Sequence, residues 1–276
     1  MSAKQPVQLG TVEETMLVPL YARALETRKK RPLLKDPKAL EIVDSIDWKF
    51  DLYAQRRRMF GCVLRTCLFD LLVQDFLRSH PEGTVVEIGA GLNTRFERLD
   101  NGRLHWFDLD LPDSMELRRR FFADAERRST IARSVADPEW IPAVRHSPGP
   151  YCFAMETVLV YLGPSLVKKA LSQIAACFPG ARLILDTASH KAVARANKDH
   201  ARRKLDARFA WPCDDPHEIE AWDIGLRLVE SQGILELPEA VKQRLSAPRR
   251  AQLALCRRLV PQISRHYRLN VFEVKN

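Results

Sequence analysis

The residues best suited to chemistry follow a short apolar run in the first third of the chain. Residues 84–88 are mostly β-branched or apolar and stop at Gly89, which with Ala90 and Gly91 forms a Gly-x-Gly turn. Such a turn after a strand lets the backbone approach a ligand closely at the carboxyl edge of a sheet. A dinucleotide-binding loop has glycine or alanine at its sixth position, where this chain has Thr94. The turn therefore predicts a ligand site and argues against NAD.

Two acidic residues lie about 20 positions after Gly89, the separation at which a carboxylate meets ribose hydroxyls in nucleotide-binding sheets. They are Asp108 and Asp110, at the end of a second predicted strand. The combination fits a nucleoside ligand that lacks a tightly held pyrophosphate. An ordinary tight turn, followed by an aspartate that caps the next helix, would leave the same pattern.

Short apolar runs alternate with helical patterns over the middle of the chain. This alternation is typical of a parallel sheet that is covered by helices on both faces. Strands are predicted at residues 84–88, 103–108, 129–135, 151–155 and 181–186, and helices at residues 113–128 and 165–177.

The two ends of the chain differ from this middle. Residues 9–80 are predicted to be helical, and residues 56–77 carry a broad apolar stripe at helical spacing. Near the C-terminus, predicted strands at 226–230 and 267–274 are separated by a helical stretch at 238–260. We therefore expect one α/β domain, in which residues 1–80 form an N-terminal helical cap, 81–190 the cofactor-binding half, and 191–276 a lid segment and the last strands.

Composition limits the class of protein. The chain has 276 residues, of which 46% are hydrophobic, and a formal net charge of +9. This is too apolar for a disordered chain, and no run approaches the roughly 20 apolar residues of a membrane span. The first residues have no apolar core of the secretory kind, so we expect a cytoplasmic protein with no membrane segment. Six cysteines without a C-x-x-C pair and seven scattered histidines predict neither a disulfide framework nor a metal site.

Two stretches, residues 85–96 and 106–112, together resemble the leucine carboxyl methyltransferase family. The resemblance is closer to the bacterial branch of that family, the O-methyltransferases associated with polyketide biosynthesis. Further stretches resemble the N-terminal cap, the Arg-Thr helix and the fourth-strand motif of this branch, namely residues 17–24 with 33–39, Leu64-Arg65-Thr66, and residues 155–162.

The resemblance implies a class I methyltransferase that uses S-adenosylmethionine and releases S-adenosylhomocysteine. It implies a Rossmann-like sheet of seven mostly parallel strands, with the last strand antiparallel, preceded by the helical cap. The chain departs from the family at Asn93, where the family usually has aspartate. This departure leaves less negative charge near the cofactor.

The resemblance also implies partners for the amino-acid end of the cofactor. Arg65 would pair with the methionine carboxylate, Arg23 would approach the same carboxylate, and Glu156 would face the ammonium group. Because this end is zwitterionic, an arginine and a carboxylate are the expected partners. Arg65 lies in an otherwise apolar helix and Glu156 directly follows a buried-looking strand, although a surface arginine and a helix-capping glutamate are the alternatives.

At the nucleoside end, the backbone of the Gly-x-Gly turn would contact the methionine and ribose portions. Asp110 would accept hydrogen bonds from the ribose hydroxyls, with Asp108 as the second candidate. Asp137, after the third strand, matches the acid that the family places near the adenine amino group.

The atom that accepts the methyl group depends on the side chains opposite the cofactor. A carboxylate is already ionised at pH 7 and needs only a positioning cation, whereas a phenol or alcohol needs a general base. His190, just past the fifth predicted strand, is the candidate base, and a plain loop histidine is the alternative. Residues 191–216 are rich in arginine and histidine, which suggests a lid with Arg195, His200 and Arg203 as candidates for binding an acid.

We therefore expect an enzyme that methylates a hydroxyl or carboxyl oxygen of a small molecule, as a monomer or a homodimer. A methyltransferase for the C-terminal leucine carboxyl group of a protein shares these motifs and is the nearest alternative, but it needs a cleft for a peptide tail. The net positive charge leaves a nucleic-acid methyltransferase or an RNA-binding protein as a more distant alternative. Nucleic-acid N-methyltransferases carry Asn/Asp-Pro-Pro-aromatic after the fourth strand, where this chain has Glu156 and Thr157.

Overall fold

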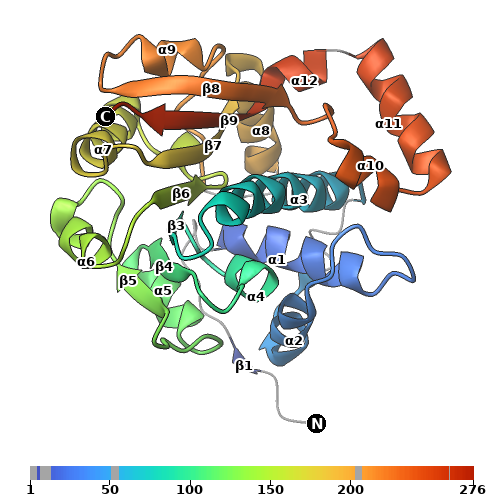
Figure 1. The fold of residues 1–276 in the computed structure, drawn as a ribbon. Coiled ribbons are helices and arrows are strands. Elements are labelled where there is room, and N and C mark those ends of the chain that lie inside the picture. Colours follow the sequence, from blue (N-terminus) through green and yellow to red (C-terminus); the bar gives the residue numbers. More distant parts are fainter. Residues whose placement is uncertain (1–4, 7–13, 51–55, 203–206, 261) are drawn as a thin grey trace.

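A seven-stranded sheet crosses the molecule in the strand order β5-β4-β3-β6-β7-β9-β8 (Figure 1). The structure is a computed structural model that describes residues 5–6, 14–50, 56–202, 207–260 and 262–276. The strands are β3 (Thr84–Ile88), β4 (His105–Asp110), β5 (Arg128–Ala132), β6 (Tyr151–Met155), β7 (Arg182–Ala188), β8 (Leu226–Gly233) and β9 (Tyr267–Val274). Neighbours from β5 to β7 pair in parallel, whereas β9 is antiparallel to both β7 and β8. The predicted sheet, mostly parallel with an antiparallel last strand, is confirmed.

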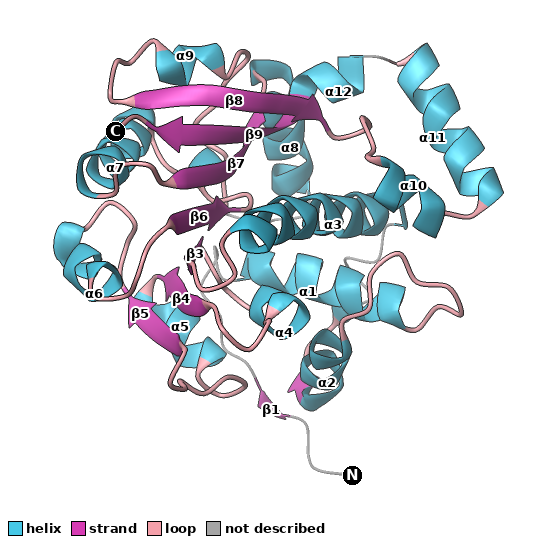
Figure 2. Ribbon diagram, in the orientation of Figure 1, coloured by secondary structure: helices cyan, strands magenta, loops and turns pink. Residues whose placement is uncertain are grey.

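Helices cover both faces of this sheet (Figure 2). The helices are α1 (Glu14–Thr27), α2 (Pro37–Ser45), α3 (Arg56–Ser79), α4 (Arg95–Leu99), α5 (Pro112–Arg118), α6 (Ile141–Arg145), α7 (Pro164–Cys177), α8 (His190–Arg202), α9 (His217–Glu220), α10 (Glu239–Arg244), α11 (Ala247–Leu259) and α12 (Gln262–His266), with 3-10 turns η2 (Pro138–Trp140) and η3 (Leu159–Tyr161). A short parallel pair, β1 (Gln5–Pro6) and β2 (Ile46–Asp47), accompanies the N-terminal helices. Among the described helices, none is long and apolar enough to cross a bilayer.

The buried strands divide the core into two layers because successive side chains point to opposite faces of the sheet. Val85 belongs to the layer shared with α1, α2 and α3, and Val86 to the layer shared with α6 and α7. In the second layer, the ring of Phe153 lies 6.1 Å from that of Trp140 and 4.9 Å from that of Phe178, centroid to centroid. Burying a side chain of this size is worth about 1.5–3 kcal/mol, so this aromatic group holds β6 firmly against the helices.

The strand order reverses between β3 and β6, and this reversal places the ligand site. The chain builds outward from β3 through β4 to β5 on one side, and from β6 onward on the other. Open α/β sheets bind ligands beyond the carboxyl ends of the strands at such a switch point. The Gly-x-Gly turn after β3 and the residues after β6 therefore face each other.

Helix α5 is shorter than the predicted helix over residues 113–128, because it ends at Arg118. Strand β5 begins at Arg128, so the residues between must return the chain to the sheet edge. Both arginines form ion pairs with the buried Asp108, at 2.9 Å and 2.8 Å. These ion pairs attach the end of α5 and the start of β5 to the same buried aspartate, and helical periodicity in the sequence does not reveal them.

In the described part of the N-terminal cap, three helices, α1, α2 and α3, are separated by turns and the short strand β2. Helix α2 begins with favourable capping, since the Asp36 carboxylate accepts a hydrogen bond from the Ala39 amide at 2.9 Å and Pro37 follows the cap directly. Helix α3 places its apolar stripe, which includes Val63, Leu64 and Leu68, in the same core layer as the sheet. This packing brings the polar residues of α3 to the carboxyl ends of β3 and β6.

Candidate functional site

A cavity of about 280 Å³ lies at the carboxyl ends of β3, β4 and β6 and is lined on one side by residues of α1 and α3. Most residues predicted to bind a cofactor line it, namely Arg23, Arg65, Gly89, Ala90, Gly91, Asp110 and Glu156. Asp108, Asp137 and His190 are not among the lining residues. The structure therefore brings the predicted amino-acid and ribose partners together in one place.

The Gly-x-Gly turn needs glycine for two separate reasons. Gly89 and Gly91 have φ angles of +66° and +43°, in the region that side-chain-bearing residues rarely adopt. In addition, a Cβ atom on Gly89 would lie 2.3 Å from Cγ2 of Val158, and one on Gly91 would lie 3.3 Å from Cβ of Met16. The turn thus runs so close to both walls of the cavity that only backbone fits there.

We expect Gly89→Ala to lower the free energy of unfolding by about 3 kcal/mol, because it adds both a disfavoured φ and a steric overlap. Gly102→Ala is the matched control, since Gly102 has a φ of +78° but a Cβ atom added there would meet nothing within 4 Å. In the control, the free energy of unfolding should fall by only about 1 kcal/mol, because the disfavoured φ acts there without a steric overlap. Urea unfolding of both variants measures the difference. Equal losses would contradict the overlap with Val158, and Gly89→Ala/Val158→Ala should recover part of the loss.

A partly buried ion pair forms the charged end of the cavity. Arg65 Nε donates to Oε1 of Glu156 at 2.7 Å, and the Thr66 hydroxyl donates to the same oxygen at 3.0 Å. The Arg65 and Glu156 side chains are 16% and 7% exposed, so the pair is partly buried, and both residues line the cavity. Burial opposes ionisation of Glu156, but the charges of Arg65 and Arg95 outweigh it and lower its pKa to about 2. Glu156 is therefore an anion at any physiological pH.

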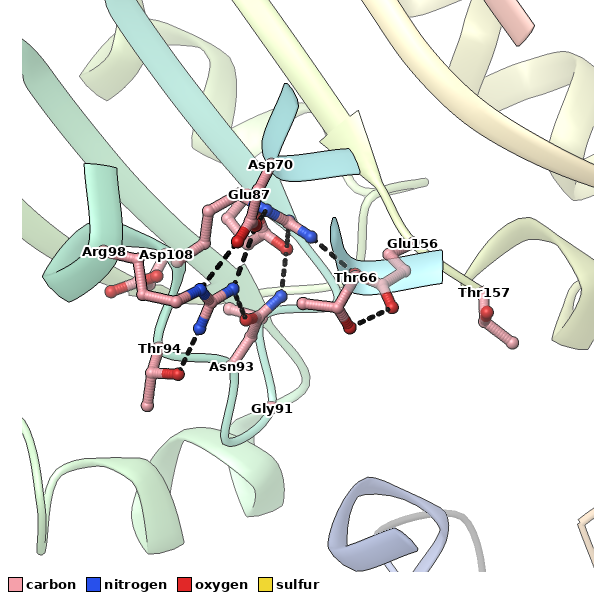
Figure 3. A network of polar contacts seen from close by, with 12 residues as sticks. Thr66, Asp70, Glu87, Gly91, Asn93, Thr94, Arg98, Asp108, Glu156 and Thr157 are labelled. Carbon is pink, nitrogen blue, oxygen red and sulfur yellow. Dashed lines mark hydrogen bonds and ion pairs between the residues drawn. The ribbon is translucent and has the colours of Figure 1, made fainter. Parts of the chain in front are cut away.

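Arg95 joins this pair to a second buried carboxylate. It is fully buried and forms ion pairs with Glu87, Asp70 and Glu156. Figure 3 shows these three carboxylates in one network of polar contacts around the turn. Burial disfavours the charged guanidinium, but these three carboxylates more than offset that cost and raise the pKa of Arg95 above its usual range. Asn93 adds its amide, which donates to Glu87 at 2.8 Å.

The network continues from the sheet into the N-terminal cap. Arg98 pairs with Asp70 at 2.7 Å and with Asp36 at 3.1 Å. Asp36 in turn pairs with Arg23 at 2.8 Å, and Arg23 also donates to the carbonyl oxygen of Leu92 at 2.8 Å. Four arginines thus alternate with three carboxylates in one chain, from Arg65 and Glu156 at the cavity to Arg23 in the cap, and Glu87 branches from Arg95. This chain of ion pairs links the position of α1 to the turn that it covers.

Most residues of this network, Arg95 and Arg98 among them, were not predicted from the sequence. Arg95 and Arg98 are one helical turn apart directly after the Gly-x-Gly turn, so they lie on one face of α4. That spacing was the available signal. It shows that the two side chains point the same way, but it cannot show that Asp70, in a different helix, lies opposite them.

Asp110 lies at the end of β4 with its carboxylate beside the turn. It accepts hydrogen bonds from the amides of Gly91 and Leu111, each at 2.7 Å. Burial raises its pKa, although these backbone hydrogen bonds work against the rise. Within the part of the chain that the structure describes, its carboxylate lines the cavity beside the turn. Its remaining acceptor positions can therefore bind hydroxyl groups of a ligand.

Asp108 lies below the turn instead of in the cavity. Its carboxylate is 1% exposed and pairs with Arg118, whose Nη1 donates to the carbonyl oxygens of Gly91 at 2.7 Å and Asn93 at 2.8 Å. Asp108, the second candidate for the ribose hydroxyls, therefore supports the turn through Arg118 and does not line the cavity. The two aspartates differ because Asp108 lies within β4, whereas Asp110 is the last residue of β4 and so lies at its carboxyl end.

Asp137, predicted to lie near the adenine amino group, does not line the cavity either. Its carboxylate accepts a hydrogen bond from the amide of Glu139 at 3.0 Å and so caps the 3-10 turn η2. The same stretch of chain instead lines the cavity with Arg133, Ser134 and Val135. A short polar residue before a proline is a strong turn-starting signal, and here that local role holds the side chain.

A different histidine from the predicted one lies at the cavity. His190 begins α8, is exposed, and places its Nδ1 2.6 Å from the Asp214 carboxylate. His200, near the other end of α8, is buried and lines the cavity with Tyr161 and Phe209. Its Nδ1 lies 2.9 Å from the carbonyl oxygen of Ala207.

The other lid candidates lie elsewhere. Arg195 is exposed on α8, and Arg203 is outside the described residues. The segment after them is not loose where the structure describes it, because the Ala210 amide donates to the Val160 carbonyl at 2.7 Å and Asn197 forms two hydrogen bonds with the Phe209 backbone. This wall of the cavity is therefore attached both to α8 and to the turn after β6.

Comparison with known proteins adds to this geometry. The family model described as leucine carboxyl methyltransferase matches residues 16–175, a segment that contains every residue predicted to bind the cofactor. The chain is 28% identical over 267 residues to the tetracenomycin polyketide synthesis O-methyltransferase TcmP of Streptomyces glaucescens, covering 96% of this chain and 97% of that one. It is 26% identical over 260 residues to the S-adenosyl-L-methionine-dependent methyltransferase dpfgK of Gibberella zeae, covering 84% and 85%.

The fold is shared with a solved structure as well. A DUF574 family protein of Streptomyces avermitilis superposes with a TM-score of 0.59 at 12% identity, covering 97% of this chain and 100% of the other.

Proposed function

Because the chain belongs to the leucine carboxyl methyltransferase family and is an S-adenosylmethionine-dependent O-methyltransferase, we propose that it methylates a hydroxyl or carboxyl oxygen of a small molecule. The observation that carries the proposal is the buried Arg65–Glu156 pair beside the Gly-x-Gly turn. The likeness to TcmP supports an acceptor of the polyketide class.

The residues of the cavity fit the cofactor in charge and in shape. Arg65 and Arg23 would hold the methionine carboxylate, Glu156 the ammonium group, and Asp110 the ribose hydroxyls. Glycine at position 91 avoids a Cβ atom that would lie 3.3 Å from Cβ of Met16 in α1 and 3.9 Å from Oδ2 of Asp110. When bound, S-adenosylmethionine supplies a methyl group on a positively charged sulfur.

The protein's own contribution is to position the acceptor and to exclude water. Bringing the two reacting groups together in a dry pocket can provide much of the rate enhancement of such a transfer. The aromatic side chains of Tyr161 and Phe209 form an apolar wall that suits a planar acceptor. They follow β6 and α8, so the acceptor would approach from the side opposite Asp110.

His200 is our candidate base for a hydroxyl acceptor, in place of His190. A carbonyl oxygen only accepts, so the contact with Ala207 assigns the proton of a neutral ring to Nδ1. Nε2 is then the basic nitrogen and would receive the hydroxyl proton. A carboxylate acceptor would need no such base.

Calorimetric titration with S-adenosylhomocysteine, with NAD as the control ligand, tests the cofactor site. We expect micromolar binding of the first and none of the second. Transfer of an isotope-labelled methyl group to 2-naphthol, 2-naphthoic acid and a peptide ending in leucine then tests the acceptor. Methylation of a naphthyl probe alone would support the proposal, whereas methylation of the peptide alone would overturn it in favour of a protein acceptor.

A further inference from the structure

The residue that follows Glu156 has an unusual backbone conformation. Thr157 has a φ of +57°, and among the described residues the only other non-glycine with a positive φ is Asp223, at +51°. A β-branched residue is strongly disfavoured in this left-handed region and stays there only when its surroundings hold it. Thr157 also lines the cavity. A disfavoured backbone beside a ligand site suggests that the conformation serves the site.

The group that holds Thr157 is a buried aspartate from the next strand. Both carboxylate oxygens of Asp186, in β7, accept from the Thr157 amide, at 2.9 Å and 3.1 Å. Oδ2 also accepts from the Thr157 hydroxyl at 3.0 Å. The phenol of Tyr267, the first residue of β9, donates to the same oxygen. Asp186 is 4% exposed, so these contacts replace its hydration.

These contacts of Asp186 affect the charged end of the cavity because Thr157 directly follows Glu156 in the chain. The peptide between Glu156 and Thr157 is pinned at its amide hydrogen, which sets the direction in which the Glu156 side chain leaves the backbone. Glu156 must point toward Arg65 and Arg95 together. A relaxed, right-handed Thr157 would rotate that peptide and move the carboxylate from both arginines.

We propose that Asp186 and Tyr267 are positioning residues for the cofactor site, which hold Thr157 in the left-handed conformation and so keep Glu156 aligned with Arg65. This inference rests on the proposed function in one respect, that Glu156 binds the cofactor. It adds two described residues, Asp186 and Tyr267, that are not among those lining the cavity.

The test is the affinity for S-adenosylhomocysteine, measured by calorimetry without turnover. Asp186→Asn keeps the side-chain volume but turns one acceptor oxygen into a donor facing the Thr157 amide, and we expect about tenfold weaker binding. Asp186→Asn/Thr157→Gly should regain most of the affinity, because glycine adopts the left-handed region without help. Tyr267→Phe removes only the hydroxyl and should weaken binding severalfold, which provides a test if Asp186→Asn does not fold.

Asp223→Gly is the matched control, since it relaxes the other left-handed residue, and it should leave the affinity unchanged. A purely structural role of Asp186 would lower the melting temperature but leave the affinity unchanged, or give no recovery with Thr157→Gly, and either result would overturn the inference. Failure of the wild-type protein to bind S-adenosylhomocysteine would instead reject the proposed function.

Discussion

Replacing Arg95 with methionine is expected to lower the free energy of unfolding by about 4 kcal/mol at pH 7.5. The side chain is fully buried and neutralises Glu87, Asp70 and Glu156 at once, so its loss leaves buried carboxylates without their partner. Methionine keeps much of the packing against Phe69, whose ring centroid lies 5.4 Å from the guanidinium. The loss of stability should therefore come mainly from the missing charge and less from the change in side-chain volume. Urea unfolding measures this loss.

The pH dependence of this loss has a defined sign. Burial already raises the pKa of Glu87, and the charge of Arg95 works against that rise. Without Arg95 the pKa of Glu87 in the folded state rises further above its unfolded value. The folded variant then binds a proton that the unfolded chain releases, so the variant regains stability as the pH falls toward 5.

The deficit relative to the wild type should thus be smaller at pH 5 than at pH 7.5. Arg127→Met is the control, because Arg127 pairs with Asp100 at the surface, and it should change stability little at either pH. An equal deficit at both pH values would contradict the explanation by unpaired carboxylates.

Replacing Arg65 with alanine is expected to weaken binding of S-adenosylhomocysteine by a factor of about 10 to 100, the range for a hydrogen bond to a charged group. The fold should survive, because Glu156 keeps its contacts with Arg95 and Thr66. Arg65→Lys keeps the charge without the planar fork and should give an intermediate affinity. Calorimetry at one fixed salt concentration measures all three proteins.

The control for this prediction lies on the same helix. Arg78 is exposed near the end of α3 and pairs with Asp75, so Arg78→Ala should leave the affinity unchanged. A loss smaller than about 1 kcal/mol in Arg65→Ala would show that Arg65 does not bind the carboxylate.

The alternating ion pairs also explain which kind of ligand group the charged end of the cavity favours. Each described arginine near the cavity already has a carboxylate partner, so the charges of the network are balanced. A ligand with a net charge at this end would leave one buried group uncompensated, which is costly. A zwitterionic end lets Arg65 and Glu156 each gain a partner of opposite sign. The network therefore favours an amino-acid group over a simple acid or amine.

The sequence by itself determined the sheet, the turn and several of the residues that line the cavity. Short apolar runs alternating with helical stripes can bury their side chains only as a parallel sheet with helices on both faces. In such a sheet all carboxyl ends lie at one edge, so the turn after β3, Asp110 and Glu156 had to come together. The apolar stripe of α3 faces this sheet, and it carries Arg65 to the same edge.

Only the tertiary structure decided between residues that have the same pattern in sequence. Asp108 and Asp110 are two positions apart, so their side chains share a face of β4 and the alternation of side chains along the strand cannot distinguish them. They differ in their distance from the carboxyl end of β4, where Asp110 is the last residue. His190 and His200 lie on one helix about 15 Å apart at 1.5 Å per residue. The direction in which α8 runs over the cavity selects His200.

The ion-pair network is the clearest case of what sequence leaves open. Local spacing determines which face of a helix or strand a side chain occupies, because that depends on the backbone of its own element. A buried charge, however, is stable only with a partner, and the partners here come from other helices and strands, as with Arg65 and Glu156. Which charges meet is therefore decided by how the elements pack, and this packing turns a set of scattered arginines and acids into one connected site.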